Sequence, residues 1–221
     1  MIYICKDNAY KLGNDFYLLC IITRKYSHYD ELSHDDKELL KSCLIREQGG
    51  ICAYCMCRIK PETSTIEHYE PRSKHPELSL DYNNLLAVCT NERDDKRRDK
   101  QCDVSRGNTD LHLNPCKKED MQHIIYKNDG EITSDYEFST DDYKYFNTDL
   151  TVTLNLNNQT LKNNRKSAFA AVLQTMSKYN KGTWNKEFVQ KWIDKYNEKQ
   201  TKPEYIGIIL YELEKRLRRS T

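Results

Sequence analysis

The chain lacks a long hydrophobic run and an export signal. Its longest apolar stretch, Phe16 to Ile22, is far shorter than the roughly 20 residues that a membrane-spanning helix needs. The N-terminus has no basic segment followed by an apolar one, as a secretory signal would. There is no internal repeat and no low-complexity segment. These absences argue against a membrane protein or an exported one, and we expect a cytoplasmic location.

An excess of either charge is also missing. The 35 Lys and Arg residues are balanced by 34 Asp and Glu, so the formal net charge is only +1. Overall charge therefore gives no reason to expect nucleic-acid binding, which would depend on local patches. Hydrophobic residues make up 38% of the 221 residues, so the core is expected to be small. We expect a bound metal and a partner subunit to supply part of the stability.

Cysteine, in contrast, is abundant, with nine residues. Without an export signal, a Cys-x-x-Cys motif more often binds metal or performs redox chemistry than forms disulfides. A thioredoxin-like redox motif would need a βαβ context, which the sequence around Cys52 and Cys55 does not offer. Zn²⁺ prefers four tetrahedral ligands, and four thiolates leave it no open position. The sequence therefore predicts a zinc site that builds structure and performs no chemistry.

The predicted zinc ligands are Cys52, Cys55, Cys89 and Cys102. The first pair has the two-residue spacing of zinc hairpins, whereas twelve residues separate the second pair. This long spacing leaves Cys57 and Cys116 open as alternative ligands. The alternative to a metal site is a set of free buried thiols.

Four polar residues between or beside these cysteines are candidates for catalysis. They are Glu67, His68, Asn84 and Asp103. Phosphodiester hydrolysis needs a base for water and a cation that neutralises the developing charge. His68 is the candidate base, because imidazole exchanges protons near neutral pH. Glu67 and Asp103 are the candidate ligands of a catalytic Mg²⁺ or Mn²⁺, since these ions prefer oxygen. Asn84 is expected to hold the loop and the orientation of His68 through amide hydrogen bonds to the backbone.

Basic residues surround these candidates in the sequence, and phosphates are natural partners for them. The predicted nucleic-acid contacts are Arg72, Arg97, Arg98 and Arg106. The alternative is a solvated loop, because the aspartates between residues 91 and 101 cancel much of the positive charge.

Taken together, these segments resemble one enzyme family. The motifs that carry the resemblance are Cys52-Ala-Tyr-Cys55, Glu67-His68-Tyr-Glu-Pro71, Asn83-Asn-Leu-Leu-Ala-Val-Cys89, Cys102-Asp-Val-Ser-Arg-Gly107 and Leu113-Asn-Pro115. They are similar to those of the HNH (ββα-metal) endonucleases. Within that group they look like the HNH subunit, often called PtuB, of Septu-type and retron-associated antiphage systems. The similarity extends over roughly residues 36–170.

The resemblance implies a metal-dependent nuclease that works with an ABC/SMC-like ATPase subunit. A retron reverse transcriptase and its RNA–DNA product are further partners that it implies. His68 takes the place of the first His of the motif, Asn84 that of the Asn, and Asp103 that of the third residue. Many HNH enzymes have Asp where Glu67 stands, which leaves its metal contact open. DNA is the favoured substrate. An RNA-cleaving nuclease and a non-catalytic zinc module that binds nucleic acid or protein remain the alternatives.

The expected fold class is α+β, with a zinc-stapled ββα-metal nuclease core and a mainly helical C-terminal extension. Strands are predicted at 16–22, 63–69, 85–88, 124–126 and 131–133, and helices at 34–47, 102–106, 159–179, 184–195 and from Pro203 onward. The predicted divisions are an N-terminal segment (1–33), the nuclease core (34–150) and a helical subdomain (151–221). The apolar stripes of that subdomain exceed what three short helices bury against each other, so we expect it to dock on a partner or brace the core. A self-contained helical bundle is the alternative.

Overall fold

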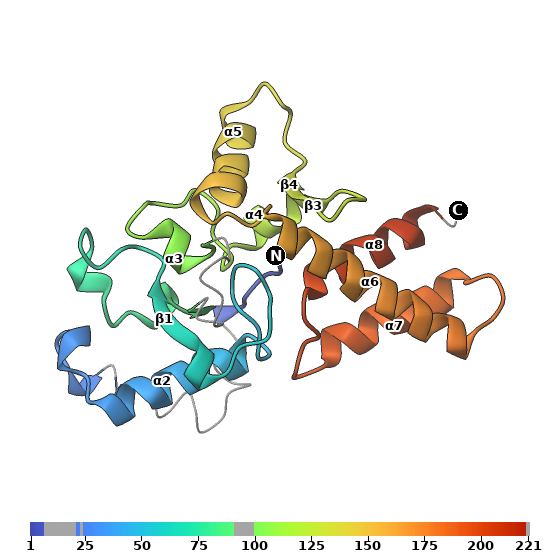
Figure 1. Ribbon diagram of the computed structural model, residues 1–221. Coiled ribbons are helices and arrows are strands. Elements are labelled where there is room, and N and C mark those ends of the chain that lie inside the picture. Colours follow the sequence, from blue (N-terminus) through green and yellow to red (C-terminus); the bar gives the residue numbers. More distant parts are fainter. Residues whose placement is uncertain (7–20, 23, 91–99, 220–221) are drawn as a thin grey trace.

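The computed structural model describes residues 1–6, 21–22, 24–90 and 100–219 (Figure 1). Within these residues, helices are mixed with two separate two-stranded antiparallel sheets. The strands are β1 (Ser64–His68), β2 (Leu85–Cys89), β3 (Ile124–Tyr126) and β4 (Ile132–Ser134). The α-helices are α2 (His34–Glu47), α3 (Asp103–Arg106), α4 (Lys118–Gln122), α5 (Asp141–Thr148), α6 (Gln159–Tyr179), α7 (Lys186–Glu198) and α8 (Ile206–Arg219). Shorter helical turns are η2 (Tyr29–Glu31), η3 (Pro61–Thr63), η4 (Pro76–Leu78), η5 (Tyr82–Asn84) and the π-helical η6 (Asp149–Thr153).

The helix α2 leads the chain into the first cysteine pair. Its N-cap is Ser33, whose hydroxyl accepts a hydrogen bond from the Asp36 N–H at 3.1 Å. The chain then turns at Gly49 and Gly50, whose φ angles of 73° and 75° are readily adopted by glycine. The helix predicted at 34–47 is therefore confirmed, with both of its end signals.

Gln48 ties the end of α2 to the buried strand β2. Its side-chain amide donates to the carbonyl oxygens of Ile51 (3.0 Å) and Ala87 (2.8 Å), and it accepts from the Ala87 N–H at 2.8 Å. The Ala87 carbonyl also accepts from the N–H of Ala53, which lies between the two cysteines of the first pair. These bonds hold the first cysteine pair against β2, which ends at Cys89.

The strands β1 and β2 pair with Glu67 opposite Leu86 and His68 opposite Leu85. Successive side chains of a strand point to opposite faces, so Glu67 and His68 leave β1 in different directions. His68 is the last residue of β1, and its ring therefore stands at the start of the loop 69–84. The strands predicted at 63–69 and 85–88 are confirmed to within one residue at each end.

The hairpin β3–β4 turns at Gly130, which has a φ angle of 87°. A Cβ atom at this position would clash with the carbonyl oxygen of Lys162 in α6. The fully buried Arg165, also in α6, donates to the Gly130 carbonyl oxygen at 2.9 Å. The hairpin predicted around residues 128–130 is therefore present, and it packs directly on the first turns of α6.

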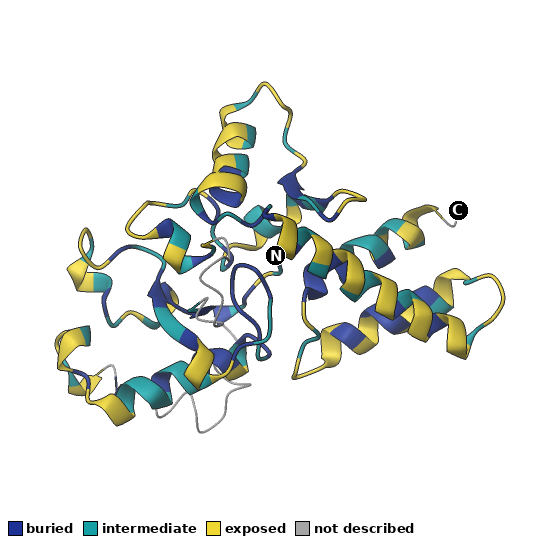
Figure 2. Cartoon of the chain, viewed as in Figure 1, coloured by how far each residue is buried: buried dark blue, intermediate teal, exposed yellow. Residues whose placement is uncertain are grey.

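Helices α6, α7 and α8 lie together on one side of the molecule, away from α2 and β1 (Figure 1). Their apolar faces are mostly covered by the chain itself (Figure 2). Val172 and Met176 of α6 are buried, as are Ile209 and Leu213 of α8. These stripes therefore do not need a partner to cover them.

The start of α8 is attached to the first cysteine pair. The N–H groups of Tyr205 and Gly207 donate to the carbonyl oxygen and the sulfur of Met56, at 2.9 Å and 3.3 Å. The N–H of Arg58 donates to the Glu204 carboxylate at 2.8 Å. The helical extension thus contacts the segment that carries Cys52 and Cys55.

Some sequence predictions need correction. Ile21 and Ile22, the end of the strand predicted at 16–22, are helical, and residues 16–20 lie outside the described part of the chain. The last helix begins at Ile206 and not at Pro203, because Tyr205 has a left-handed φ of 56°. Helices α4 and α5 are additional to the helices that the sequence predicts. The divisions at residues 33 and 150 stay predictions, although η6 continues across the second. Among the described residues, no helix is long and apolar enough to cross a membrane.

Candidate metal centre and catalytic cleft

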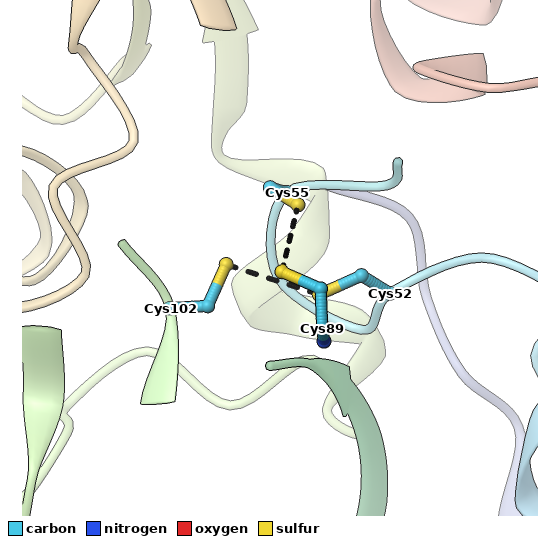
Figure 3. A group of neighbouring side chains, drawn as sticks. All are labelled: Cys52, Cys55, Cys89 and Cys102. Atoms are coloured by element: carbon cyan, nitrogen blue, oxygen red, sulfur yellow. Dashed lines mark hydrogen bonds between the residues drawn. The ribbon is translucent and has the colours of Figure 1, made fainter. Parts of the chain in front are cut away.

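Four cysteine sulfurs meet in the interior. The sulfurs of Cys52, Cys55, Cys89 and Cys102 all lie within 4.8 Å of one another, and all four residues are buried (Figure 3). The Cys52–Cys102 and Cys55–Cys89 sulfur pairs are each separated by 3.8 Å. Four thiolates placed tetrahedrally at about 2.3 Å from Zn²⁺ would be about 3.8 Å apart. This spacing fits a zinc tetrathiolate and is too long for a disulfide, whose sulfurs are about 2.05 Å apart.

The two alternative ligands lie differently. Cys57 is half-buried next to this group, and its carbonyl oxygen accepts from the Cys52 N–H at 2.9 Å, but its sulfur does not belong to the set of four. Cys116 is half-buried elsewhere in the chain, where burial raises the pKa of its thiol and the nearby charges are those of Lys6 and Glu47. Among the described residues, the four cysteines predicted as zinc ligands are the ones that come together.

Cys102 enters the cluster through an unusual backbone conformation. Its φ of 55° and ψ of −134° lie in a region that non-glycine residues rarely adopt, at a cost on the order of 1–3 kcal/mol. The Cys102 N–H donates to the Leu154 carbonyl oxygen at 2.9 Å, which fixes the backbone from the side of η6. The next residue, Asp103, begins α3. The strained cysteine therefore places a sulfur in the cluster and a carboxylate at the start of a helix.

His68 stands at the end of β1 with a defined ring orientation. Its Nε2 lies 2.9 Å from the Ser79 carbonyl oxygen, which can only accept a hydrogen bond. We therefore assign the ring proton to Nε2, which leaves Nδ1 as a hydrogen-bond acceptor. The Tyr29 ring packs edge-on against the imidazole, with 4.8 Å between ring centres. Burial lowers the pKa of His68 to about 4, although the hydrogen bond to Ser79 acts to raise it. The ring is therefore neutral near pH 7.

Asn84 holds both ends of the loop 69–84. Its side-chain oxygen accepts from the Glu70 N–H at 2.6 Å. Its side-chain nitrogen donates to the carbonyl oxygens of Glu70 and Leu78, each at 3.1 Å. The loop that Asn84 closes in this way includes Ser79, the partner of the His68 ring. Asn84 is thus connected to His68 through the backbone.

Glu67 is buried in an ion pair with Arg106. The guanidinium donates to Glu67 Oε1 at 2.5 Å, and the Tyr54 hydroxyl donates to the same oxygen at 3.1 Å. Burial raises the pKa of Glu67 to about 7; Arg106 opposes this rise and Asp103 adds to it. Asp103 therefore lies within electrostatic reach of Glu67.

Arg106 is part of the interior of the site. Its side chain is 1% exposed, and besides Glu67 it donates to the backbone oxygens of His68, Tyr69 and Thr109. The sequence prediction that Arg106 contacts nucleic acid does not fit this position. Its guanidinium joins the end of β1 to α3, and we leave it out of the proposed interface.

A polar cleft of about 560 Å³ opens beside these groups. It is lined by Glu67, His68, Arg72 and Asp103 among others, so the structure brings together four of the predicted site residues. Asn84 is not among the lining residues and holds the loop 69–84 instead. Arg97 and Arg98 fall outside the described residues.

Sequence reasoning missed two residues of the N-terminal segment. Asp30 lines the cleft and accepts a hydrogen bond from Arg72 at 2.6 Å. Tyr29 packs on His68, and the Arg72 guanidinium lies 4.7 Å from the centre of the Tyr29 ring. Neither belongs to a motif, and about forty residues separate them from His68 in the sequence. Only the tertiary fold shows that η2 is part of this cleft.

Two curated proteins are similar to this chain in sequence. The Septu protein PtuB of Bacillus thuringiensis is 28% identical over 81 residues, which are 36% of this chain and 28% of that protein. A candidate HNH endonuclease of retron Vc95 from Vibrio cholerae serotype O1 biovar El Tor is 25% identical over 99 residues, 43% of this chain and 47% of that protein. The chain resembles HNH-type proteins of antiphage defence systems. No family model matches it.

The resemblance inferred from the motifs is therefore confirmed by these comparisons. The chain spans less than half the length of the curated relatives it matches.

Proposed function

We propose that this chain is a metal-dependent HNH endonuclease that hydrolyses nucleic-acid phosphodiester bonds, with DNA as the favoured substrate. The observation that carries the proposal is the environment of His68. Its ring is oriented by a backbone carbonyl and lines a polar cleft together with Glu67 and Asp103, and Asp103 follows directly on Cys102 of the four-cysteine cluster. In this proposal β1, β2 and α3 form the ββα-metal core.

His68 acts as the general base in this mechanism. Because Nε2 donates to Ser79, Nδ1 takes the proton from the attacking water. Asn84 keeps that ring in place by closing the loop that carries Ser79. Arg72 lines the cleft and is 40% exposed, and a phosphate would compete with the exposed Asp30 carboxylate for its guanidinium.

Asp103, with Glu67 beside it, would hold Mg²⁺ or Mn²⁺. When bound, the ion would neutralise the charge that develops on the phosphate. Asp103 is the better placed of the two, because Oε1 of Glu67 already accepts from Arg106 and Tyr54. We expect Asp103→Ala to reduce cleavage by at least ~100-fold and to shift the Mg²⁺ and Mn²⁺ concentrations needed for activity upward, measured as the metal dependence of the cleavage rate. An unchanged metal dependence would remove Asp103 from the ion site.

The cysteine cluster fits structural zinc in this proposal, and a buried cation supports it. Zn²⁺ with four thiolates carries a net charge of −2. Arg165 is fully buried, and its Nε has no hydrogen-bond partner in the described structure. Burial lowers the pKa of Arg165, whereas Tyr126 and then Cys55, Tyr205 and Cys102 act to raise it. A dianionic zinc centre would supply the negative charge that this buried guanidinium needs.

The partner proposed from the resemblance is an ABC/SMC-like ATPase subunit, and in a retron system the reverse transcriptase with its RNA–DNA product. The experiment is co-expression with the ATPase gene, pull-down, and a nuclease assay on DNA and on RNA with Mg²⁺, with Mn²⁺ and without divalent metal. Cleavage of DNA that depends on the added metal is the expected result. Cleavage of RNA alone would favour the RNA-cleaving alternative. Binding with no cleavage under any condition would leave the non-catalytic zinc module.

Arg106→Met is expected to destabilise the fold by about 3–5 kcal/mol, because it leaves the Glu67 carboxylate buried without its cation. The matched control is Arg72→Met, which breaks an ion pair at the surface and should change stability far less. Urea unfolding followed by circular dichroism measures both. Similar midpoints for the two variants would show that the buried pair contributes no more than the exposed one.

A further inference from the structure

The two parts of this chain carry opposite charge. Residues 159–221 contain 14 Lys and Arg but 6 Asp and Glu, a net charge of +8. Residues 1–158 contain 21 Lys and Arg but 28 Asp and Glu, a net charge of −7. The overall charge of +1 conceals this division. Such asymmetry is typical of chains in which one part meets a polyanion.

The positive charges are on the surface of the three-helix lobe α6–α8. Exposed basic side chains occur in all three helices, in the loop before α7 and just after α7: Lys166, Lys178, Lys181, Lys186, Lys191, Lys195, Lys199, Arg216, Arg218 and Arg219. The lobe lies to one side of the elements that form the catalytic cleft, and α8 points its C-terminal end away from them (Figure 1).

The lobe also has a hollow at its most basic end. A cavity of about 610 Å³ lies between the start of α7 and the last turns of α8, and Trp184, Lys215, Arg216 and Arg219 line it. The Arg216 guanidinium lies 5.7 Å from the centre of the Trp184 ring. Lys215 pairs with Glu212 at 3.1 Å. Three cations converge here from one helix against a single lining carboxylate.

We infer that the lobe α6–α8 binds the phosphate backbone of a nucleic acid outside the catalytic cleft, with the hollow at the end of α8 as its centre. Duplex DNA carries a phosphate charge for every ~1.7 Å of its length, and basic side chains that meet it release counterions. The remainder of the chain, at −7, repels such a substrate, and Asp30, Glu67 and Asp103 add carboxylates around the cleft. We therefore assign most of the affinity to the lobe, with Arg72 as a single additional contact at the cleft. The inference rests on the proposed function for its choice of a nucleic acid over an acidic protein.

The test measures binding of the full chain to fluorescein-labelled 30-nucleotide duplex DNA and RNA by anisotropy, without added divalent metal and over a range of salt concentrations. The variant is the triple change Lys215→Gln, Arg216→Gln and Arg219→Gln. The matched control removes three exposed lysines from the acidic part of the chain: Lys60→Gln, Lys117→Gln and Lys144→Gln. We expect the lobe variant to bind about 10–100-fold more weakly and its salt slope to fall by about 2–3, with little change in the control.

Arg216 packs over aromatic rings, so the single change Arg219→Glu at the exposed end of α8 provides a second variant in case the triple one fails to fold. It should weaken binding several-fold while α8 stays intact by circular dichroism. Equal affinity of the folded lobe variants and the control would overturn the inference, whether or not the wild type cleaves. The inference would also be overturned if polyglutamate displaced the labelled DNA as effectively as unlabelled DNA of equal charge, because the lobe would then be a site for acidic protein. A third outcome separates the two proposals. If the lobe variants bind more weakly but the wild-type protein cleaves nothing with any metal, the lobe is a nucleic-acid binding site and the proposed nuclease activity is wrong.

Discussion

Cys52→Ser is expected to abolish zinc binding and to leave the protein largely unfolded or insoluble. The four sulfurs come from the hairpin after α2, from the end of β2 and from the residue before α3, so a metal at their centre would join three separate parts of the chain. Structural zinc sites contribute on the order of 10–16 kcal/mol, which is comparable with the whole stability of a domain of this size. Removal of one thiolate therefore costs more than the other interactions can replace.

Elemental analysis of protein purified without added metal measures this effect, and one zinc per wild-type chain is the expected content. Cys116→Ser is the matched control, because this half-buried thiol is not part of the set of four and should keep both metal and fold. A wild-type protein that is folded but contains almost no zinc would refute the site. A loss of zinc in Cys116→Ser would show that the ligand set is assigned wrongly.

The cysteine cluster can be predicted from sequence because cysteines in such a pattern have few roles other than metal binding. The Cys52–Cys55 spacing itself indicates a metal, and Cys89 follows an apolar strand whose position is readable. Cys102 was the difficult ligand. Its backbone conformation and its bond to Leu154 depend on η6, which is some fifty residues further along the chain. Local sequence contains no sign of such a distant support.

The parts of the cleft that sequence missed are held by backbone groups or by distant residues. The orientation of His68 depends on the Ser79 carbonyl, and any residue type could supply that oxygen. Tyr29 and Asp30 reach the cleft from a segment that was predicted as separate. Arg106 shows the opposite problem, since its charge suggested a phosphate contact while its position is buried against Glu67. Residue type predicts which chemistry is available, but burial decides which partner the group meets.

His68→Ala is expected to reduce cleavage by about 10²–10⁴-fold, the usual contribution of a general base, while zinc content and fold stay unchanged. His68 is not among the four grouped ligands, and its ring makes one hydrogen bond, to Ser79. Loss of this bond and of the packing against Tyr29 should therefore cost about 1–3 kcal/mol of stability, less than the loss of a zinc ligand. The rate is measured on DNA with Mg²⁺ or Mn²⁺ at saturating substrate, together with elemental analysis and thermal unfolding.

His123→Ala is the matched control, since this half-exposed imidazole pairs with Asp135 and does not line the cleft. It should cleave at the wild-type rate. If His68→Ala loses its zinc or unfolds, His68 has a structural role and the proposed base is wrong. If His68→Ala is folded, retains zinc and cleaves as fast as the control, the reaction does not use this imidazole. Loss of cleavage with nucleic-acid affinity retained is the result that a general base requires, because such a group acts on the water and contributes little to binding the substrate.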